Sequence, residues 1–284
     1  MRPGVSSYSF RKHIVATKCN YIDICNIAKE MGFEGIEFVE LDNREFGITT
    51  DPIACAKEIK EHCANIGLEI IAYTVGANIM AEDFESEYER ICKCIDVAKE
   101  LGAPVMRHDA CSKLPSVPRA NWEDTIDVMA PRIRRITEYA QSLGVKTCTE
   151  NHGYLIQAPE RVERLIRAVN HDNYGWLCDM GNFLCADADP LKSVTIAAPY
   201  TFHVHAKDFL YKSAELKRPA GFFKTVNGNH LRGTVLGHGV VPVEACIKAL
   251  RNGGYDGWIS IEFEGMEENL PALRTGLELL KSVI

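Results

Sequence analysis

The chain has 284 residues, 46% of them hydrophobic, and a formal net charge of −7. It has no Lys/Arg-rich run and no stretch near the ~20 apolar residues of a membrane span, and the N-terminal MRPGVSSYSF lacks an apolar signal core. These features argue against a nucleic-acid partner and a membrane location, and they predict a soluble cytoplasmic protein with a large core.

The eleven cysteines sit mostly inside apolar helix or strand patterns. We expect them to be reduced thiols that act as small core residues rather than disulfides. Cys92 and Cys94 form a C-x-C pair, but no second Cys/His pair stands at zinc-finger spacing. The sequence therefore predicts no structural zinc site.

A helix–glycine–strand phrase recurs along the chain, as in AKEMGFEGIEF, ANIGLEIIAYT, AKELGAPVMRH and AQSLGVKTCTE. Glycine is the preferred residue just after a helix, and helices that alternate with short apolar strands indicate βα units. Strands are expected near 4–10, 35–40, 68–75, 105–110, 145–151, 175–180, 201–206 and 258–263. Helices are expected near 20–31, 51–66, 83–101, 121–143, 159–169, 190–198, 242–252 and 267–282.

Eight βα units in a chain of this length predict an α/β fold, a single-domain (β/α)8 TIM barrel over residues 1–284. An open doubly wound sheet is the alternative, but the first strand is not followed by a glycine-rich phosphate turn. The stretch at about 209–241 has no clear periodicity and is too long for an ordinary βα loop. We expect it to be an irregular lid or substrate loop on the catalytic face.

Four successive strands end in a polar side chain: Glu150, Asp179, His205 and Glu262. In a barrel these ends meet at the active-site mouth, while neighbours such as Phe202 and Val204 should point outward against the helices. Three carboxylates would repel one another there unless a divalent cation joined them. Three oxygen donors and one imidazole suit Mn²⁺, with Mg²⁺, Co²⁺ or Fe²⁺ as alternatives and Zn²⁺ less favoured.

Other polar residues near the strand ends are candidates for substrate contact or for support of the metal. His152 follows Glu150 by two residues and is either a catalytic acid/base or a support for the ligands. Arg107 and His108 end the fourth strand, and one of them should face the mouth and bind substrate hydroxyls. Lys207 is a candidate for substrate contact or for an ion pair at the rim.

Three further residues are left with two readings each. Arg232, in the long loop, suits an anionic substrate group, although a solvated loop arginine is an equal alternative. Glu264 shares the parity of Glu262 and either supports the site or caps the loop. His203 lies one layer deeper in the barrel than His205 and is expected in a core or supporting role.

The motifs CTENHG, CDMGNF, FHVHAKDF and SIEFEG resemble the last four strand motifs of the xylose-isomerase-like barrel superfamily. That group includes sugar isomerases and epimerases, inosose isomerases and dehydratases, and the endonuclease IV type of DNA-repair enzyme. In its ketose-epimerase branch a Glu-Asp-His-Glu set holds the metal, and the resemblance places these ligands at Glu150, Asp179, His205 and Glu262. It also implies that the two glutamates form the acid/base pair.

One position departs from that branch. Where the branch typically has a substrate-binding histidine after the strand-6 aspartate, this chain has Asn182 in DMGNF. An asparagine can still hydrogen-bond a hydroxyl, so Asn182 is a candidate substrate-binding residue. The departure argues against a simple ketose 3-epimerase.

From these motifs and the resemblance we predict a metal-dependent isomerase or epimerase of a keto-sugar or related polyol. It would act by abstracting a proton next to a carbonyl. The alternative is a lyase of the same fold, either inosose dehydratase-like or one that cleaves a 3-keto-glycoside by β-elimination. An apurinic endonuclease and a non-catalytic sugar-binding barrel are less favoured. The partner is then a small sugar or polyol, and a homo-oligomer or another subunit is expected by analogy.

Overall fold

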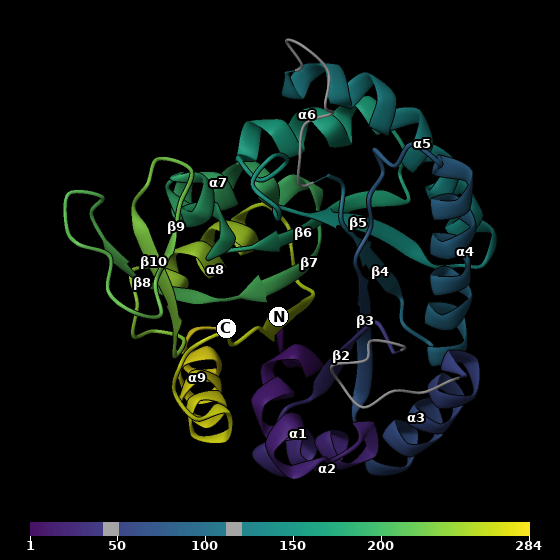
Figure 1. Ribbon diagram of the computed structural model, residues 1–284. Helices are drawn as coiled ribbons and strands as arrows, with labels where there is room; N and C mark the ends of the chain where they lie inside the picture. Colours follow the sequence, from purple (N-terminus) through teal and green to yellow (C-terminus); the bar gives the residue numbers. More distant parts are fainter. Residues whose placement is uncertain (42–50, 112–120) are drawn as a thin grey trace.

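The protein is described here by a computed structural model that covers residues 1–41, 51–111 and 121–284 (Figure 1). Eight parallel strands close into a barrel in the order β1-β11-β7-β6-β5-β4-β3-β2, so the predicted single-domain TIM barrel is confirmed. The barrel strands are β1 (Arg2–Ser6), β2 (Gly35–Val39), β3 (Glu69–Val75), β4 (Val105–His108), β5 (Lys146–Glu150), β6 (Tyr174–Asp179), β7 (Thr201–Ala206) and β11 (Trp258–Ile261).

Helices pack around the outside of the barrel, and consecutive helices from α2 to α8 lie side by side. In the described part of the chain they are α1 (Arg11–Thr17), α2 (Tyr21–Met31), α3 (Pro52–Ile66), α4 (Phe84–Leu101), α5 (Trp122–Ser142), α6 (Pro159–Val169), α7 (Pro190–Ala197), α8 (Val243–Asn252) and α9 (Asn269–Val283). The main hydrophobic core lies between these helices and the barrel. The predicted helix ending at glycine is seen at Gly32, which caps α2 with φ of 91°.

Two local predictions at the N-terminal part of the chain need correction. The first strand, expected to reach residue 10, ends at Ser6, and Ser7–Phe10 forms a 3₁₀ turn. The turn leads directly into α1, a helix that the sequence reading did not include. Ser6 ends the strand because its hydroxyl accepts a hydrogen bond from the backbone N–H of Tyr8, which caps the turn.

A small apolar cluster, separate from the main core, joins adjacent barrel strands and consists of Ala72, Val105, Cys148 and Leu177. Phe202, expected to face the helices, packs against this cluster instead. The cause is a break in register between β6 and β7, where Trp176 pairs with Thr201 but Leu177 pairs with His203. One extra residue in β7 therefore turns Phe202 inward without changing the inward direction of His203 and His205.

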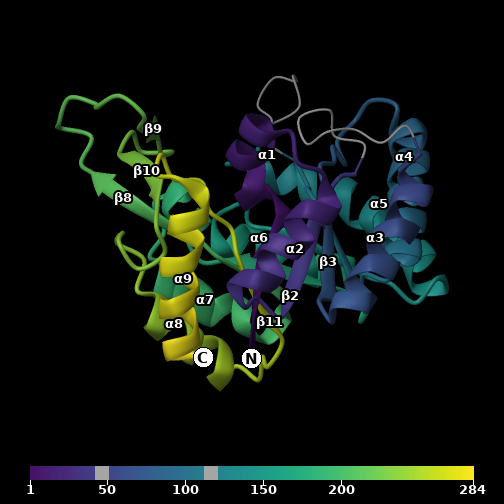
Figure 2. The same cartoon turned by 90° about the horizontal axis from the view of Figure 1, so that it is seen from below.

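The stretch expected to be an irregular loop at about 209–241 contains a three-stranded antiparallel sheet joined by irregular turns. It contains β8 (Asp208–Lys212), β9 (Phe223–Lys224) and β10 (His230–Thr234) in the order β8-β10-β9. Figure 2 shows this sheet and α1 toward the same end of the molecule. The expectation failed because two of these strands are short and polar, so neither shows the apolar alternation of a buried strand.

Asp208 anchors the turn that follows this sheet. Its Oδ2 accepts hydrogen bonds from the backbone N–H groups of Gly237 and Gly239 at 2.9 and 2.8 Å. Its Oδ1 accepts from Phe209 and Val241 at 2.8 and 3.0 Å. A Cβ atom at Gly239 would overlap the Asp208 carboxylate, so only glycine permits this close approach.

We expect Asp208→Ala to lower the free energy of unfolding by about 2–4 kcal/mol, because it leaves several backbone donors unsatisfied at a site that is 2% exposed. Asp208→Asn keeps one acceptor oxygen and should lose less. Denaturant unfolding of both variants measures the difference. An alanine variant as stable as the parent would contradict the anchoring role of this carboxylate.

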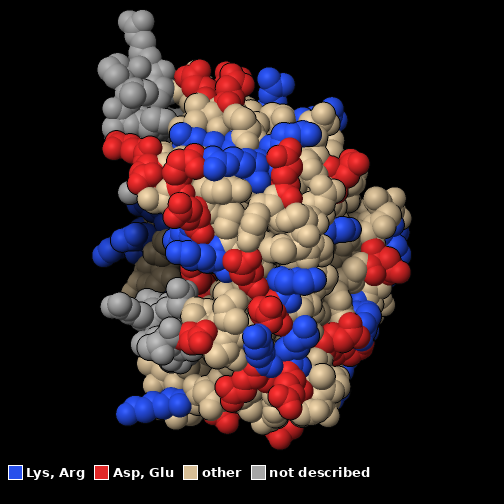
Figure 3. Space-filling view, turned by 90° about the vertical axis from the view of Figure 1, so that its right-hand side faces the viewer, with Lys and Arg blue, Asp and Glu red and all other residues tan. Residues whose placement is uncertain are grey.

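The cysteines, the surface charges and the helix lengths can be compared with what the composition predicted. The eleven cysteines all lie in the described residues, none is in a disulfide, and eight are buried. On the face over α3, α4 and α5, Lys/Arg and Asp/Glu side chains are intermixed (Figure 3). Within residues 1–41, 51–111 and 121–284, no helix is both long and apolar enough to span a bilayer.

Candidate metal centre

A cavity of about 350 Å³ lies at the mouth of the barrel, where the strands finish. Its walls carry most of the polar side chains that follow the strands. The lining residues are Tyr8, Val39, Glu40, Thr74, Gly76, Arg107, Asp109, Glu150, His152, His205, Lys207, Glu262 and Glu264.

The four predicted ligands converge beside this cavity. Glu150, Asp179, His205 and Glu262 each offer one ligand atom, and these atoms all lie within 4.8 Å of one another. Nδ1 of His205 is 3.4 Å from Glu262 Oε2, 3.7 Å from Glu150 Oε1 and 3.8 Å from Asp179 Oδ2. The imidazole thus faces all three carboxylates from one side.

Asn151, between Glu150 and His152 in the sequence, joins the ends of β5 and β6. Its Oδ1 accepts from the backbone N–H of Asp179 at 3.0 Å and from Trp176 Nε1 at 3.1 Å. Its Nδ2 donates to the carbonyl oxygen of Asp179 at 2.9 Å. The polar residues at the end of β5 therefore have two roles. Glu150 belongs to the carboxylate–histidine cluster, and Asn151 holds the end of β6 in place.

The donor set fits a divalent cation. Asp179 Oδ1 is satisfied by the backbone N–H groups of Gly181 and Asn182, at 2.8 and 2.9 Å. Asp179 Oδ2 and His205 Nδ1, by contrast, are buried and make no hydrogen bond within the described residues, although the Lys207 ammonium lies 3.2 Å from Asp179 Oδ2. Burial raises the pKa of Asp179 to about 7, which is the behaviour of a carboxylate that lacks full charge compensation. A cation between these atoms would satisfy both.

Glu150 is held at both of its oxygens. Arg107 donates to Oε2 through Nε at 2.7 Å and through Nη2, and Asn182 Nδ2 donates to Oε1 at 2.8 Å. Burial would raise the pKa of Glu150, but Arg107, His205 and His152 together hold it well below its ordinary value. Asn182, expected to contact substrate, thus orients this carboxylate.

Lys207 lies at the edge of the carboxylate cluster. Its ammonium is 3.2 Å from Asp179 Oδ2 and 3.4 Å from Glu264 Oε1, and it pairs with Glu262 Oε2. Burial would lower the pKa of Lys207, but Asp179 and Glu262 hold it well above its usual value. Lys207 therefore supplies one fixed positive charge to this acidic mouth.

His152 and Asp109 form a pair at the cavity rim. Nδ1 of His152 is 3.1 Å from Asp109 Oδ1, and Asp109 is in turn 3.2 Å from Arg107 Nη2. The imidazole is half exposed, so it can meet a molecule that enters the cavity. Burial lowers the pKa of His152, but the hydrogen bond to Asp109 and the charge of Glu150 raise it overall.

Two predicted substrate-binding residues lie away from this cavity. His108 is buried on the outer side of β4, where its ring stacks on Tyr174 with centroids 5.9 Å apart. Arg232, in β10, is 3.3 Å from Glu267 Oε1 and lies over the ring of Phe222. Of the pair that ends β4, Arg107 is therefore the one that faces the mouth.

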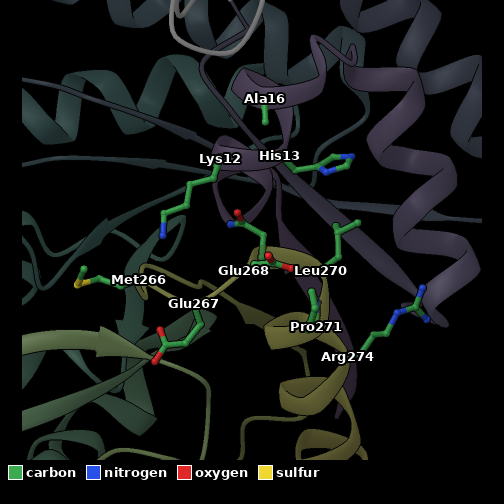
Figure 4. Close-up of a pocket in the computed structure, with 10 residues that line it drawn as sticks. Lys12, His13, Ala16, Met266, Glu267, Glu268, Leu270, Pro271 and Arg274 are labelled. Atoms are coloured by element: carbon green, nitrogen blue, oxygen red, sulfur yellow. The ribbon is translucent and has the colours of Figure 1, made fainter.

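A second, larger depression of about 610 Å³ lies between α1 and the start of α9 (Figure 4). Figure 4 shows Lys12 and His13 of α1 across from the segment that carries Met266 to Pro271. This depression shares none of the residues that line the barrel-mouth cavity. It holds no residue of the carboxylate–histidine cluster, so the smaller cavity is the candidate site.

Sequence reasoning missed Glu37, which lies in β2 and contacts His205 on the side of the ring away from the carboxylate cluster. It is fully buried and contacts both His203 and His205. The available signal was a charged residue between the buried Ile36 and Phe38, in a strand that should read as continuously apolar. Such a carboxylate requires a partner, and the partner's position depends on strands more than 160 residues away.

The fold and this cluster define a (β/α)8 barrel with a carboxylate–histidine cluster at its mouth. The profile of the xylose isomerase-like TIM barrel family matches residues 25–283, and the chain belongs to that family.

Two curated relatives illustrate what the chain is similar to. It is 26% identical to the rhizopine catabolism protein MocC of Rhizobium meliloti over 215 residues, which are 70% of this chain and 63% of MocC. It is 27% identical to an inosose dehydratase of Lacticaseibacillus casei over 145 residues, 50% of this chain and 48% of that protein. The matched stretches thus span about half to two thirds of these relatives.

Solved structures agree with the fold. The probable 3-DHS dehydratase AsbF of Bacillus anthracis superposes with a TM-score of 0.76 at 21% identity, covering 99% of each chain. The IolI protein, solved with a bound zinc atom, gives 0.77 at 17% identity, covering 100% of this chain and 98% of IolI. The 3-keto-D-glucoside 4-epimerase YcjR of E. coli gives 0.72 at 17% identity, covering 99% of each chain.

Proposed function

We propose that the protein is a divalent-metal-dependent lyase that removes water from a keto-polyol such as an inosose. The observation that carries this proposal is the state of Glu150, whose two oxygens are taken by Arg107 and Asn182. A carboxylate held in this way is a good fixed ligand and a poor proton carrier. The names of the curated relatives, which include inosose dehydratases, point in the same direction.

The metal would be held by Glu150, Asp179, His205 and Glu262. We propose Mn²⁺ because the set is rich in oxygen donors, with Zn²⁺ as the alternative given the zinc atom in the related IolI structure. When bound, the ion supplies Lewis-acid stabilisation of the negative charge that develops on the substrate's carbonyl oxygen.

Glu262 is the proposed base. Its contacts with Lys207 and His205 both involve Oε2, and the side chain remains 12% exposed to the cavity. It takes the proton from the carbon next to the carbonyl, and the C–H electron pair moves into the enolate of the substrate. As the carbonyl re-forms, the bond between the β-carbon and its hydroxyl breaks.

His152 is the proposed acid. Asp109 orients the imidazole at the rim, and both residues line the same cavity as Glu262. His152 gives a proton to the departing hydroxyl, which leaves as water, and the product is the unsaturated ketone. The proton taken by Glu262 returns to solvent and the half-exposed His152 regains one from solvent, so the reaction consumes no other reagent. In a 3-keto-glycoside the same steps would release the aglycone alcohol.

An isomerase or epimerase is the second candidate, because Glu150 and Glu262 belong to one cluster and line one cavity. In that case both glutamates would move protons, one on each face of the substrate. The two candidates share the first step and differ in whether a carbon–oxygen bond breaks.

The test is a screen of the Mn²⁺-loaded protein against inososes, 3-keto-glycosides and ketoses in D₂O, followed by NMR. A lyase gives an unsaturated ketone and releases water or alcohol. A deuterated, epimerised or isomerised sugar without unsaturation would favour the second candidate. Failure of every substrate to exchange a C–H proton would overturn both.

We expect His152→Gln to separate the two steps. Loss of the general acid should slow water release by about 10²–10⁴-fold, while deuterium exchange at the carbon next to the carbonyl continues. Parallel measurement of exchange and elimination rates on one substrate checks this. Equal loss of both rates would contradict the role of His152 as the acid for the leaving group.

A further inference from the structure

The buried carboxylate of Glu37, in β2, reaches across the barrel interior to two histidines of β7. Its Oε1 is 2.8 Å from Nε2 of His205 and its Oε2 is 2.5 Å from Nε2 of His203. All three side chains are essentially without solvent exposure. The function proposed above assigns no role to Glu37 or His203.

Hydrogen-bond chemistry fixes the tautomer of His205 in this arrangement. A carboxylate only accepts, so the Nε2 atoms of both histidines must carry a hydrogen. A neutral imidazole with hydrogen on Nε2 has its lone pair on Nδ1. In His205 that atom is buried, lacks a hydrogen-bond partner among the described residues, and lies 3.4–3.8 Å from the three cluster carboxylates.

We propose that Glu37 is a positioning residue that makes His205 present Nδ1, and not Nε2, to the cation. This inference rests on the metal site of the proposed function, but not on the reaction assigned to it. A carboxylate that accepts from the remote nitrogen of a metal-bound histidine fixes the ring and increases the basicity of the ligand nitrogen.

His203 keeps Glu37 in place. It binds the second oxygen of the carboxylate, and its ring meets that of His205 edge to face with centroids 5.7 Å apart. With one oxygen on each histidine, the Glu37 side chain cannot rotate without breaking a buried hydrogen bond. Glu37 thereby fixes the ring plane of His205 independently of the carboxylates at the mouth.

The same three residues could in principle form a second cation site, since their ligand atoms lie close together. The distances favour hydrogen bonds. Ligand atoms that share one ion at ~2.1 Å are themselves roughly 3 Å or more apart, whereas Glu37 lies 2.5 and 2.8 Å from the two nitrogens. We therefore expect a single ion per chain.

The first test is Glu37→Gln, measured as cation affinity by competition with a chelator and as the visible spectrum of bound Co²⁺. A glutamine has one acceptor oxygen, so one of the two histidines loses its acceptor and meets an N–H group. The affinity should fall by about 10–100-fold and the Co²⁺ spectrum should change. Unchanged affinity and spectrum in a folded variant would overturn the proposal.

His203→Gln is the matched control, because its amide can still donate to Glu37 while the imidazole is lost. Its affinity should fall by less than about tenfold, below the range for a carboxylate that supports a ligand. A loss as large as that of Glu37→Gln, or binding of two ions per chain, would instead indicate that the three residues form a cation site of their own.

A measurement on the unaltered protein covers the case in which Glu37→Gln does not fold. In ¹⁵N-labelled protein loaded with ¹¹³Cd, the metal should couple to Nδ1 of His205, and Nε2 should carry a proton. Coupling to Nε2 would overturn the proposal. Neither experiment needs turnover, so an error in the proposed reaction would leave both results interpretable.

Discussion

Glu262→Gln is expected to reduce kcat by about 10²–10⁴-fold, the usual contribution of a positioned base. Glu262 is the cluster carboxylate that keeps some exposure to the cavity, while Glu150 is occupied at both oxygens. The amide keeps the size of the side chain but cannot accept the substrate proton. The measurement is the rate of deuterium exchange next to the carbonyl, together with product formation at saturating metal.

The matched control is Glu264→Gln, two residues further along the same loop. Glu264 also lines the cavity and lies 3.4 Å from Lys207, but it is not part of the four-residue cluster. Its effect on exchange should be much smaller. Equal losses in the two variants would point to a general effect of negative charge at the mouth, and an active Glu262→Gln would exclude Glu262 as the base.

Asp179→Asn is expected to weaken cation binding by more than about 100-fold, the upper end of the range for residues that only support ligands. The amide oxygen can replace Oδ1, which accepts from Gly181 and Asn182. The amide nitrogen would then stand where Oδ2 lies and would point N–H groups at the cation. Activity should fall with affinity, and excess Mn²⁺ should restore only part of it.

Titration of the metal-free protein with Mn²⁺ measures this effect, and thermal unfolding shows whether the variant is folded. The metal-free variant should unfold close to the parent, because both backbone hydrogen bonds to the side-chain oxygen remain. The Glu264→Gln control should bind Mn²⁺ almost as well as the parent. Parent-like affinity in Asp179→Asn would remove Asp179 from the ligand set.

The barrel was predictable because its signal is local and repeated. Each βα unit carries a helix, a glycine and a short apolar strand, and eight such units leave few arrangements. The same approach missed α1 and the β8-β10-β9 sheet, since these short polar elements are stabilised by tertiary contacts such as those of Asp208. The prediction that the Phe202 side chain points outward was wrong, because a register break between two strands leaves no mark in either strand's own sequence.

The cluster of Glu150, Asp179, His205 and Glu262 could be anticipated because a barrel brings the ends of successive strands to one mouth. The contacts that each side chain makes at the mouth could not be predicted from the sequence. That Arg107 would pair with Glu150, or that Asn182 would orient it, depends on rotamers and on cross-strand distances. Glu37 shows the same limit, because its partners come from a strand on the far side of the barrel.

The most direct test is a crystal structure of the Mn²⁺-loaded protein with anomalous diffraction at the manganese edge. We expect one strong anomalous peak per chain, bounded by Glu150, Asp179, Glu262 and Nδ1 of His205, with Lys207 displaced from the carboxylates it now contacts. A peak at another location, or full catalytic activity in protein shown to be free of divalent metal, would contradict the account.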